Sequence, residues 1–421
     1  MPTPRIVELA QIIASRTDEL KEHLTSNDLP EPSFSPEGPI DAFGSATSDV
    51  QQAKNSVVEA AIELRQLLEG PVRSLLPEVS NFAPLAAIHR FKIATHVPME
   101  GGITFSDLAS LCGLLEHDLR RVIRYAATHH RVFCEPEKGL VAHTAASKLL
   151  AENEMFENLM GLTFAECWPA HSKAVDAMAE RSEEPDRSGY ALANSTNLNM
   201  FEFLAQHPDR AKRFARAMSS TSPASLDALA SYFDWASLPD GSTVVDVGGA
   251  QGHVSFHLAR KFPHISFVVQ DLPEVVEGAE ATMPEDLKER VKFFGHNMFN
   301  EQPVRDAEVY LLRYVLHDWP DKYCVNILQC LVPALKRGAK VVVQEHLLPE
   351  PGTLSLLQEM QLRSMDAIMM TLFNSRERDI EDWRTIFETA NSNYCGFLAT
   401  RVKANPSTGI IQVEWADKDS P

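Results

Sequence analysis

The spacing of apolar residues divides the chain into a helical part and a later part made of short apolar runs. Residues 4 to 24 and 50 to 68 repeat apolar positions at helical spacing. The Pro-rich stretch between them, SNDLPEPSFSPEGPIDAFGS, cannot continue a helix. We therefore assign residues 1–80 to a helical N-terminal extension.

Residues 81–150 predict a compact module of three helices. The segments FAPLAAIHRFKIATHV, TFSDLASLCGL and EHDLRRVIRYAATHHRVF have helical spacing, and Ser106 is the expected cap of the second. The following CEPEKGLVAHT is typical of a short hairpin, which gives the module a winged-helix pattern. Residues 151–235 continue as linking helices, among them NMFEFLAQHPDRAKRFARAMSS and SLDALASYF.

Residues 236–421 show the second pattern. The runs STVVDVGG, ISFVVQDL, AEVYLLRYVL and AKVVVQEHLL are rich in Val, Ile and Leu, and helical stretches separate them. Continuous apolar strands that alternate with helices predict a parallel sheet covered on both faces. The last segment, CGFLATRVKANPSTGIIQVEWA, predicts two strands around an Asn-Pro-Ser-Thr-Gly turn, which add an antiparallel edge. The expected fold class is α/β.

Composition and charge restrict the possible partners. A chain of 421 residues exceeds the usual size of one core, so two domains are expected. A formal net charge of −19 argues against nucleic acid or an anionic membrane as partner. We find no run of about 20 apolar residues that would span a membrane and no secretory signal. The six cysteines form no C-x-x-C pair, which predicts reduced thiols in the cytoplasm and no metal site.

Polar residues follow the first two predicted strands, where ligands bind in open parallel sheets. The first strand ends in a glycine turn with Gly248, Gly249 and Gly252, and the second ends at Asp271. Glycines let a ligand approach the backbone, and an acid in the second position can accept both hydroxyls of a ribose. Together they favour a nucleoside ligand. An ordinary strand-to-helix turn and a helix cap at Asp271 remain the alternatives.

The third and fourth strands end at His317-Asp318 and at Glu345, and Glu377 opens a later helix. If the strands are neighbours, Glu345 lies beside His317. An imidazole flanked by carboxylates is held in one tautomer and is stabilised when it gains a proton, as in a supported general base. For Glu377, an ion pair with Arg376 or Arg378 is the alternative.

Six segments in this order resemble the S-adenosylmethionine-dependent O-methyltransferases of the plant phenolic and fungal secondary-metabolite type. They are VVDVGGAQGH, VVQDLPEVV, FFGHNMF, LLRYVLHDWPD, QEHLLPEPG and NSRERDIEDW, and the resemblance covers nearly the whole chain. It implies a Rossmann-like methyltransferase sheet behind an N-terminal dimerisation domain. It also implies S-adenosylmethionine as cofactor and methyl transfer to a hydroxyl of an aromatic or polyketide-like metabolite.

The resemblance implies a role for each of several residues. His317 would remove the acceptor proton, with Glu345 and Glu377 orienting its ring. The cofactor contacts that it implies are Gly248, Asp271, Asn297, Met298, Arg313, Trp319 and Ser222. The substrate contacts that it implies are Asp318, Phe214, Met218, Trp168, Met365 and Met369. At helical spacing, the two methionines at 365 and 369 are also typical of plain core.

Three positions depart from the family pattern. Ala250 replaces a glycine, Asn297 stands where an acid usually meets the adenine amino group, and Arg313 replaces a lysine. Each affects expected cofactor affinity, but none removes the predicted base. In the family the N-terminal helices exchange between subunits, which implies a homodimer.

Two other functions compete with methyl transfer. Some fungal relatives of this fold catalyse a dehydration or a pericyclic step with the cofactor bound, and the presence of His317, Glu345 and Glu377 favours transfer over these. The winged-helix pattern and the locally basic DLRRVIRYAATHHR would also suit a DNA-binding regulator, which the acidic charge of the whole chain disfavours.

Overall fold

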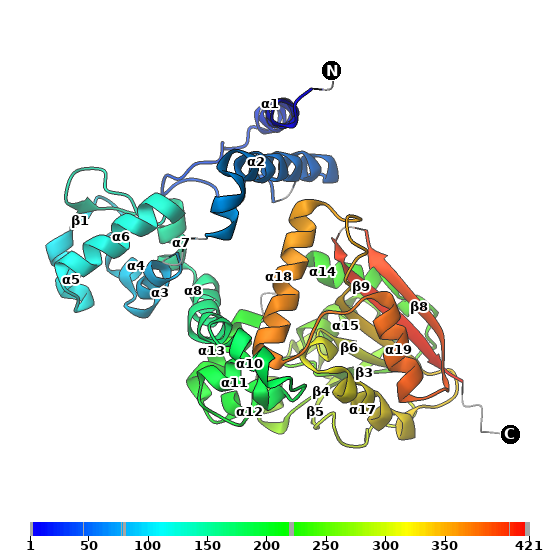
Figure 1. The fold of residues 1–421 in the computed structure, drawn as a ribbon. Coiled ribbons are helices and arrows are strands. Elements are labelled where there is room, and N and C mark those ends of the chain that lie inside the picture. Colours follow the sequence, from blue (N-terminus) through cyan, green and yellow to red (C-terminus); the bar gives the residue numbers. More distant parts are fainter. Residues whose placement is uncertain are drawn as a thin grey trace. The chain divides into compact units, whose positions relative to one another are not determined.

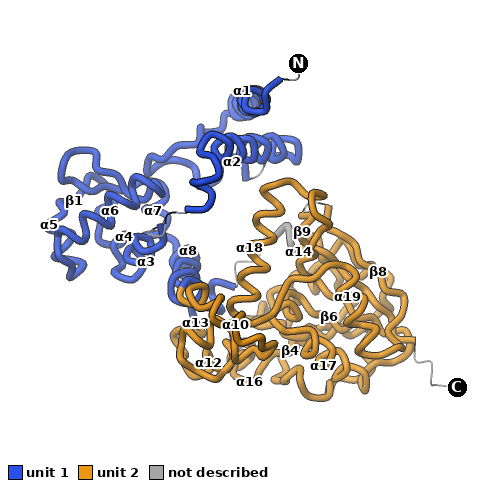
Figure 2. The backbone as a smooth tube through the Cα atoms, in the orientation of Figure 1, with its two compact units in different colours: residues 1–168, 212–220 blue, residues 169–211, 221–421 orange. Residues whose placement is uncertain are grey.

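The structure is a computed structural model that describes residues 3–44, 46–76, 78, 81–218, 223–403 and 405–416. It divides into two compact units, coloured separately in Figure 2. Unit 1 comprises residues 1–168 and 212–220, and unit 2 comprises residues 169–211 and 221–421. The sequence-based boundaries at 80, 150 and 235 stay predictions.

Unit 1 begins with the two predicted helices, α1 (Arg5–Ser26) and α2 (Ser48–Leu75), which pack against each other. Their buried contacts include Leu20 and Leu24 from α1 and Ala53 from α2. Gly70 has φ of +72° and Pro71 follows it in the chain, so α2 is kinked at this point. The N-terminal extension is therefore helical, as predicted.

Residues 85–151 of unit 1 share one apolar core. Thr104, not the predicted Ser106, caps α5: its side chain accepts a hydrogen bond from the Asp107 N–H at 3.1 Å. The cap needs an extended backbone, which Thr104 has, whereas Ser106 already lies in the helix. The predicted hairpin forms a single bridge, Cys134 to Ala142, and β1 pairs with β2. The elements are α3 (Ala83–Arg90), α4 (Ile93–His96), β1 (Ile103–Thr104), α5 (Phe105–Cys112), α6 (Glu116–His130), β2 (Leu140–Val141), α7 (Ala145–Glu152), α8 (Glu154–Gly161) and a π-helix (Leu162–Cys167).

The described part of unit 2 contains a seven-stranded sheet in the order β5-β4-β3-β6-β7-β9-β8. The first five strands in this order are parallel, whereas β9 is antiparallel to both β7 and β8, so the predicted mostly parallel sheet is confirmed. The strands are β3 (Thr243–Val247), β4 (Ser266–Asp271), β5 (Val291–Gly295), β6 (Val309–Arg313), β7 (Lys340–His346), β8 (Tyr394–Val402) and β9 (Asn405–Trp415).

The last two strands correct one detail of the sequence analysis. The predicted turn, residues 405–409, lies inside β9, where Gly409 pairs with Glu345 of β7. Val402 of β8 already pairs with Asn405, so the chain reverses before the predicted turn. Pro406 is tolerated because it sits at the beginning of the strand.

Helices cover both faces of the sheet because its strand residues alternate between two cores. Val245, Tyr310 and Val341 point toward α17 and α19, whereas Val244, Val309 and Val342 point toward α14 and α15. Figure 1 shows α17 and α19 in front of the sheet. The helices of unit 2 are α10 (Ala174–Glu180), α11 (Gly189–Ala193), α12 (Met200–Ala205), α14 (Pro223–Tyr232), α15 (His253–Lys261), α16 (Pro273–Val276), α17 (Asp321–Leu331), α18 (Leu356–Phe373) and α19 (Ile380–Ala390). Two more, α9 (Trp168–His171) and α13 (Pro208–Met218), contribute residues to both units.

Two further observations concern the residues that the structure describes. No helix within the described residues is long and apolar enough to cross a membrane. All six cysteines lie among the described residues, and each is a free thiol.

Candidate active site

The candidate site lies where the strand order of the sheet reverses. From β3 the chain moves to β4 on one side, and it later returns to β6 on the other side. The loops after β3 and β6 therefore separate at this point, which is where open α/β sheets bind ligands.

The loop after β3 has a backbone that requires its glycines. Gly248 and Gly252 have φ of +75° and +76°. A Cβ on Gly248 would lie 2.7 Å from Val315 Cγ2, and one on Gly249 would lie 2.8 Å from Asp246 Cγ. Ala250 also adopts a positive φ, of 47°, so the turn keeps its shape although this position has lost its glycine.

Asp271 joins the end of β4 to this glycine turn. Its Oδ2 accepts a hydrogen bond from the Ala250 N–H at 2.9 Å, and its Oδ1 accepts one from the Leu272 N–H at 2.8 Å. The residue that caps α16 is Leu272, so the helix-cap alternative for Asp271 is wrong. Burial raises the pKa of Asp271. Each carboxylate oxygen keeps a further acceptor position, which suits a pair of ribose hydroxyls.

Beyond β6, a 3-10 turn (Leu316–Asp318) carries the predicted base. Glu345, near the end of the neighbouring β7, holds this turn from beneath. Its Oε1 accepts hydrogen bonds from the backbone N–H groups of Val315, Leu316 and His317 at 3.0, 2.8 and 3.3 Å. Glu345 is completely buried. It therefore fixes the backbone that presents His317, a role the sequence did not predict.

The imidazole of His317 lies among three carboxylates. Its Nδ1 is 2.9 Å from Glu377 Oε1 and 3.7 Å from Glu345 Oε2, and its Nε2 is 3.7 Å from Asp318 Oδ1. A carboxylate can only accept, so Nδ1 donates to Glu377 and Nε2 remains for proton exchange. The structure thus brings together the predicted trio of His317, Glu345 and Glu377.

The pKa values in this cluster depend on burial and on the neighbouring charges. Burial lowers the pKa of His317, but the charges of Glu345, Asp318 and Glu377 outweigh this and raise it to about 10. Burial also raises the pKa of Asp318, to about 7, and that of Glu345. The cluster therefore favours an imidazolium and stabilises the product of proton abstraction.

The alternative for Glu377, an ion pair with a neighbouring arginine, is wrong. Arg376 pairs with Asp321 at 2.8 Å and with Asp382 at 3.0 Å. Arg378 pairs with Asp321 at 2.7 Å. Both guanidinium groups are thus directed to aspartates, and the Oε1 of Glu377 accepts from His317.

The remaining residues predicted to bind the cofactor lie near the ends of the strands, apart from one. Arg313 closes β6, where its Nε donates to Gln344 Oε1 at 2.9 Å. Trp319 is buried against Phe299, with ring centroids 4.7 Å apart. Met298 packs against the same core, while the Asn297 side chain accepts from the Phe299 N–H at 3.0 Å. Ser222 lies outside the described residues.

The residues predicted to contact the substrate belong to different units. Asp318 lies beside His317, and Met365 and Met369 lie on α18, with Met369 buried. Trp168, Phe214 and Met218 belong to unit 1. A shared wall formed by all of them stays a prediction.

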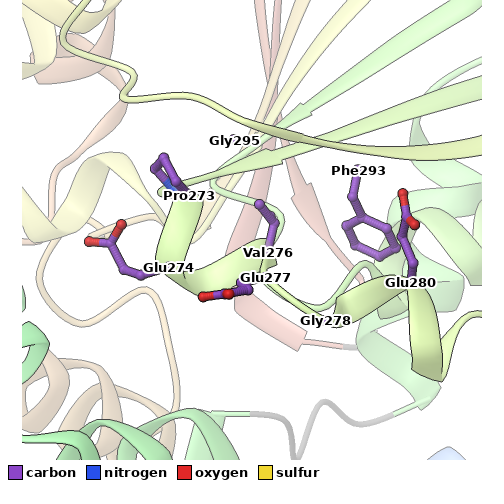
Figure 3. Close-up of a pocket in the computed structure, with 8 residues that line it drawn as sticks. All are labelled: Pro273, Glu274, Val276, Glu277, Gly278, Glu280, Phe293 and Gly295. Carbon is purple, nitrogen blue, oxygen red and sulfur yellow. The ribbon is translucent and has the colours of Figure 1, made fainter.

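A depression of about 600 Å³ lies beside β5 and α16. Figure 3 shows the side chains that line it. It lies on the Asp271 side of the sheet, since Gly295 in its lining pairs with Asp271. It is bordered by carboxylates and by the ring of Phe293. Its lining residues are Pro273, Glu274, Val276, Glu277, Gly278, Glu280, Phe293 and Gly295.

Comparisons with known proteins decide the family. Residues 174–393 match a family described as an O-methyltransferase domain. The grayanic acid biosynthesis cluster O-methyltransferase of Cladonia grayi is 41% identical over 415 residues, which cover 97% of this chain and 88% of that protein. This chain belongs to the O-methyltransferase family. It is a methyltransferase that depends on S-adenosylmethionine.

Solved structures share the fold of this O-methyltransferase at low sequence identity. OxaC in complex with SAH and oxaline has a TM-score of 0.76 at 19% identity, covering 97% of this chain and all of that one. A structure described as a pericyclic reaction enzyme has a TM-score of 0.70 at 21% identity, covering 96% of this chain and all of that one. These likenesses establish the fold only.

The geometry of the O-methyltransferase fits S-adenosylmethionine. The turn at Gly248 leaves no room for a side chain, and Asp271 offers both carboxylate oxygens beside it. The cofactor carries a sulfonium charge and no phosphate, so carboxylates suit it better than a cluster of basic residues. Gly248 and Asp271 would hold its nucleoside.

We expect Asp271→Ala to weaken cofactor binding by at least about tenfold, because a pair of hydrogen bonds to one charged group contributes about 1.5–3 kcal/mol each. Isothermal titration with S-adenosylhomocysteine measures this loss. Asp286→Asn, at an exposed carboxylate paired with Arg260, is the matched control and should bind normally. Equal affinity of the Asp271→Ala variant and the unmodified enzyme would contradict the assignment.

Sequence reasoning did not predict that Asp321 and Arg378 hold the turn that carries His317. Arg378 is completely buried, an exceptional environment for a guanidinium. Both residues stand in segments that the sequence analysis singled out, Asp321 in HDWPD and Arg378 directly after Glu377. The sequence does not show that they lie close together in space.

Proposed function

We propose that this enzyme transfers a methyl group from S-adenosylmethionine to a hydroxyl of an aromatic or polyketide-like secondary metabolite, with His317 as general base. The observation that carries the proposal is the 2.9 Å contact between His317 Nδ1 and Glu377 Oε1 in a buried cluster. A base needs one nitrogen held and the other directed to the acceptor. A fungal relative named for the grayanic acid biosynthesis cluster supports a secondary metabolite as the acceptor.

His317 performs the proton transfer in this proposal. Its Nε2 takes the proton of the acceptor hydroxyl, and Glu377 and Glu345 stabilise the resulting imidazolium. Asp318, 3.7 Å from Nε2, accepts a hydrogen bond from a second substrate hydroxyl. Most of the acceleration comes from alignment, since methyl transfer is an in-line displacement.

The base must be neutral before it can act. With a pKa of about 10, His317 in the cluster alone is largely protonated at neutral pH. S-adenosylmethionine, when bound, would supply the electrophilic methyl group and leave as S-adenosylhomocysteine, and its positive charge would lower the pKa of a nearby imidazolium. Turnover should therefore fall as pH is lowered through the pKa of His317 in the cofactor complex.

A screen of phenolic and polyketide acceptors with methyl-labelled S-adenosylmethionine tests the reaction. We expect the label to enter at least one acceptor in equal amount to the S-adenosylhomocysteine formed. A dehydration or pericyclic reaction would convert a substrate without forming S-adenosylhomocysteine. That result would replace methyl transfer with the competing function. Family membership already favours an enzyme over a DNA-binding regulator.

We also propose that the enzyme is a cytoplasmic homodimer in which the winged-helix-like module and the N-terminal helices take part in dimerisation. The free cysteines suit a reducing compartment. Large apolar side chains of α2 are exposed, among them Leu68 at 69% and Leu75 at 80%. Sedimentation at micromolar concentration should give twice the 46.9 kDa chain mass, and a stable monomer would contradict this.

A further inference from the structure

Arg378 connects the two segments that carry His317 and Glu377. Its Nη2 donates to the Trp319 carbonyl at 2.7 Å, and its Nη1 donates to the Leu316 carbonyl at 3.3 Å. These two carbonyls lie on either side of His317 and Asp318. Arg378 itself follows Glu377 directly, so one buried side chain fixes the turn relative to the neighbouring carboxylate.

Asp321, the first residue of α17, holds the guanidinium in this place. Its Oδ1 accepts from Arg378 Nε at 2.8 Å, and its Oδ2 accepts from Arg376 Nη2 at 2.8 Å. Burial alone would raise the pKa of Asp321, but the two arginines hold it below its usual range. One carboxylate thus engages both arginines that flank Glu377 in the sequence.

This arrangement affects Glu377 through charge. A guanidinium beside Glu377 would neutralise it and weaken its bond to His317. Because Asp321 draws both guanidinium groups away, the carboxylate of Glu377 is left to the imidazole.

We propose that Arg378, anchored by Asp321, is a positioning residue that sets the contact between His317 and Glu377 in the methyl-transfer reaction. The inference rests on the proposed role of His317 as base. Neither Arg378 nor Asp321 touches the reacting atoms. They act by holding the turn at Leu316 and Trp319 and by keeping positive charge from Glu377.

Asp321→Asn is the sharpest variant, because it keeps the shape of a half-exposed side chain and removes only its charge. Arg376 and Arg378 would then compete with His317 for the carboxylate of Glu377, which would weaken the contact between Glu377 and the imidazole. We expect the pKa of His317 to fall by about one unit. At alkaline pH, where His317 is neutral in both enzymes, we also expect kcat to fall about tenfold because the ring is held less well, with the KM for S-adenosylmethionine unchanged.

The pKa is read by NMR of the enzyme with ¹⁵N-labelled histidine, where the His317 signals are those missing from His317→Ala. Other charged and titratable groups face the ring and are kept in every variant: Glu345, Glu377, Asp318, His346 and Tyr314. Asp382→Asn is the matched control. It removes the other partner of Arg376 but leaves Arg378 on Asp321, so the pKa of His317 should not change.

Arg378→Lys provides a second test if Asp321→Asn is poorly folded. A lysine keeps the charge but cannot reach both carbonyls and Asp321 in a fork, so the pKa of His317, and kcat at alkaline pH, should again fall. An unchanged pKa in the folded variants would overturn the inference. The NMR readout needs no turnover, whereas the base assignment is tested by the turnover of His317→Ala, so the two can fail separately.

Discussion

Replacing His317 with alanine should lower turnover at least about 100-fold while S-adenosylmethionine still binds. The Nε2 atom of His317 lies beside Asp318, and the surrounding carboxylates stabilise the protonated imidazole. A phenol with a pKa near ~10 is mostly protonated at neutral pH, so losing the base leaves too little of the attacking anion. Single-turnover kinetics with saturating cofactor measure the loss directly.

Two controls separate a lost base from a damaged site. Binding of S-adenosylhomocysteine to His317→Ala should stay within a few-fold of normal, because Asp271 and the glycine turn come from other strands. Turnover of the variant should also rise at alkaline pH, where more of the acceptor is ionised without help. Near-normal turnover at neutral pH would place the base elsewhere.

Glu345→Ala should both destabilise the protein and abolish most of its turnover. Three buried backbone N–H groups share Glu345 Oε1, and removing it leaves all of them without their acceptor. At about 1–3 kcal/mol for each group, the free energy of unfolding should fall by at least about 3 kcal/mol. Denaturant titration measures this, and an unchanged midpoint would contradict the structural role.

Glu345→Gln separates the two contributions of this residue. Glutamine keeps an acceptor oxygen for the turn but removes the negative charge. We expect stability close to normal and a lower pKa of His317, because one of the charges that raise it is gone. The acid side of the pH–rate profile should therefore move to lower pH. A profile that does not move would mean that Glu345 supports only the backbone.

Periodicity and strand-end chemistry were enough to predict the sheet and the residues gathered at its edge. The runs around Val245, Tyr310 and Val342 are apolar at most positions because both faces of these strands are covered, and such a pattern indicates parallel strands. Strand ends in one parallel sheet meet at one edge, so Asp271, His317 and Glu345 could be placed there without coordinates.

The sequence-based predictions that proved wrong depend on contacts or backbone angles that only the folded chain defines. Which partner Glu377 takes depends on whether Asp321 is close enough to engage both arginines, and 55 positions separate Asp321 from Arg376. Thr104 rather than Ser106 caps α5 because of local backbone angles. The chain reverses before the predicted turn because the hydrogen-bonded pairing of β9 with β7 extends to Thr408. This cross-strand pairing outweighs the turn propensity of Asn405-Pro406.

The central claim is that His317 exchanges the proton of the acceptor. It is tested most directly by a crystal structure of the enzyme with S-adenosylhomocysteine and an acceptor identified in the screen. We predict the reacting oxygen within about 2.6–3.2 Å of His317 Nε2, with Nδ1 still bonded to Glu377. A reacting oxygen that contacts another titratable side chain, with the ring of His317 turned away from it, would contradict the account.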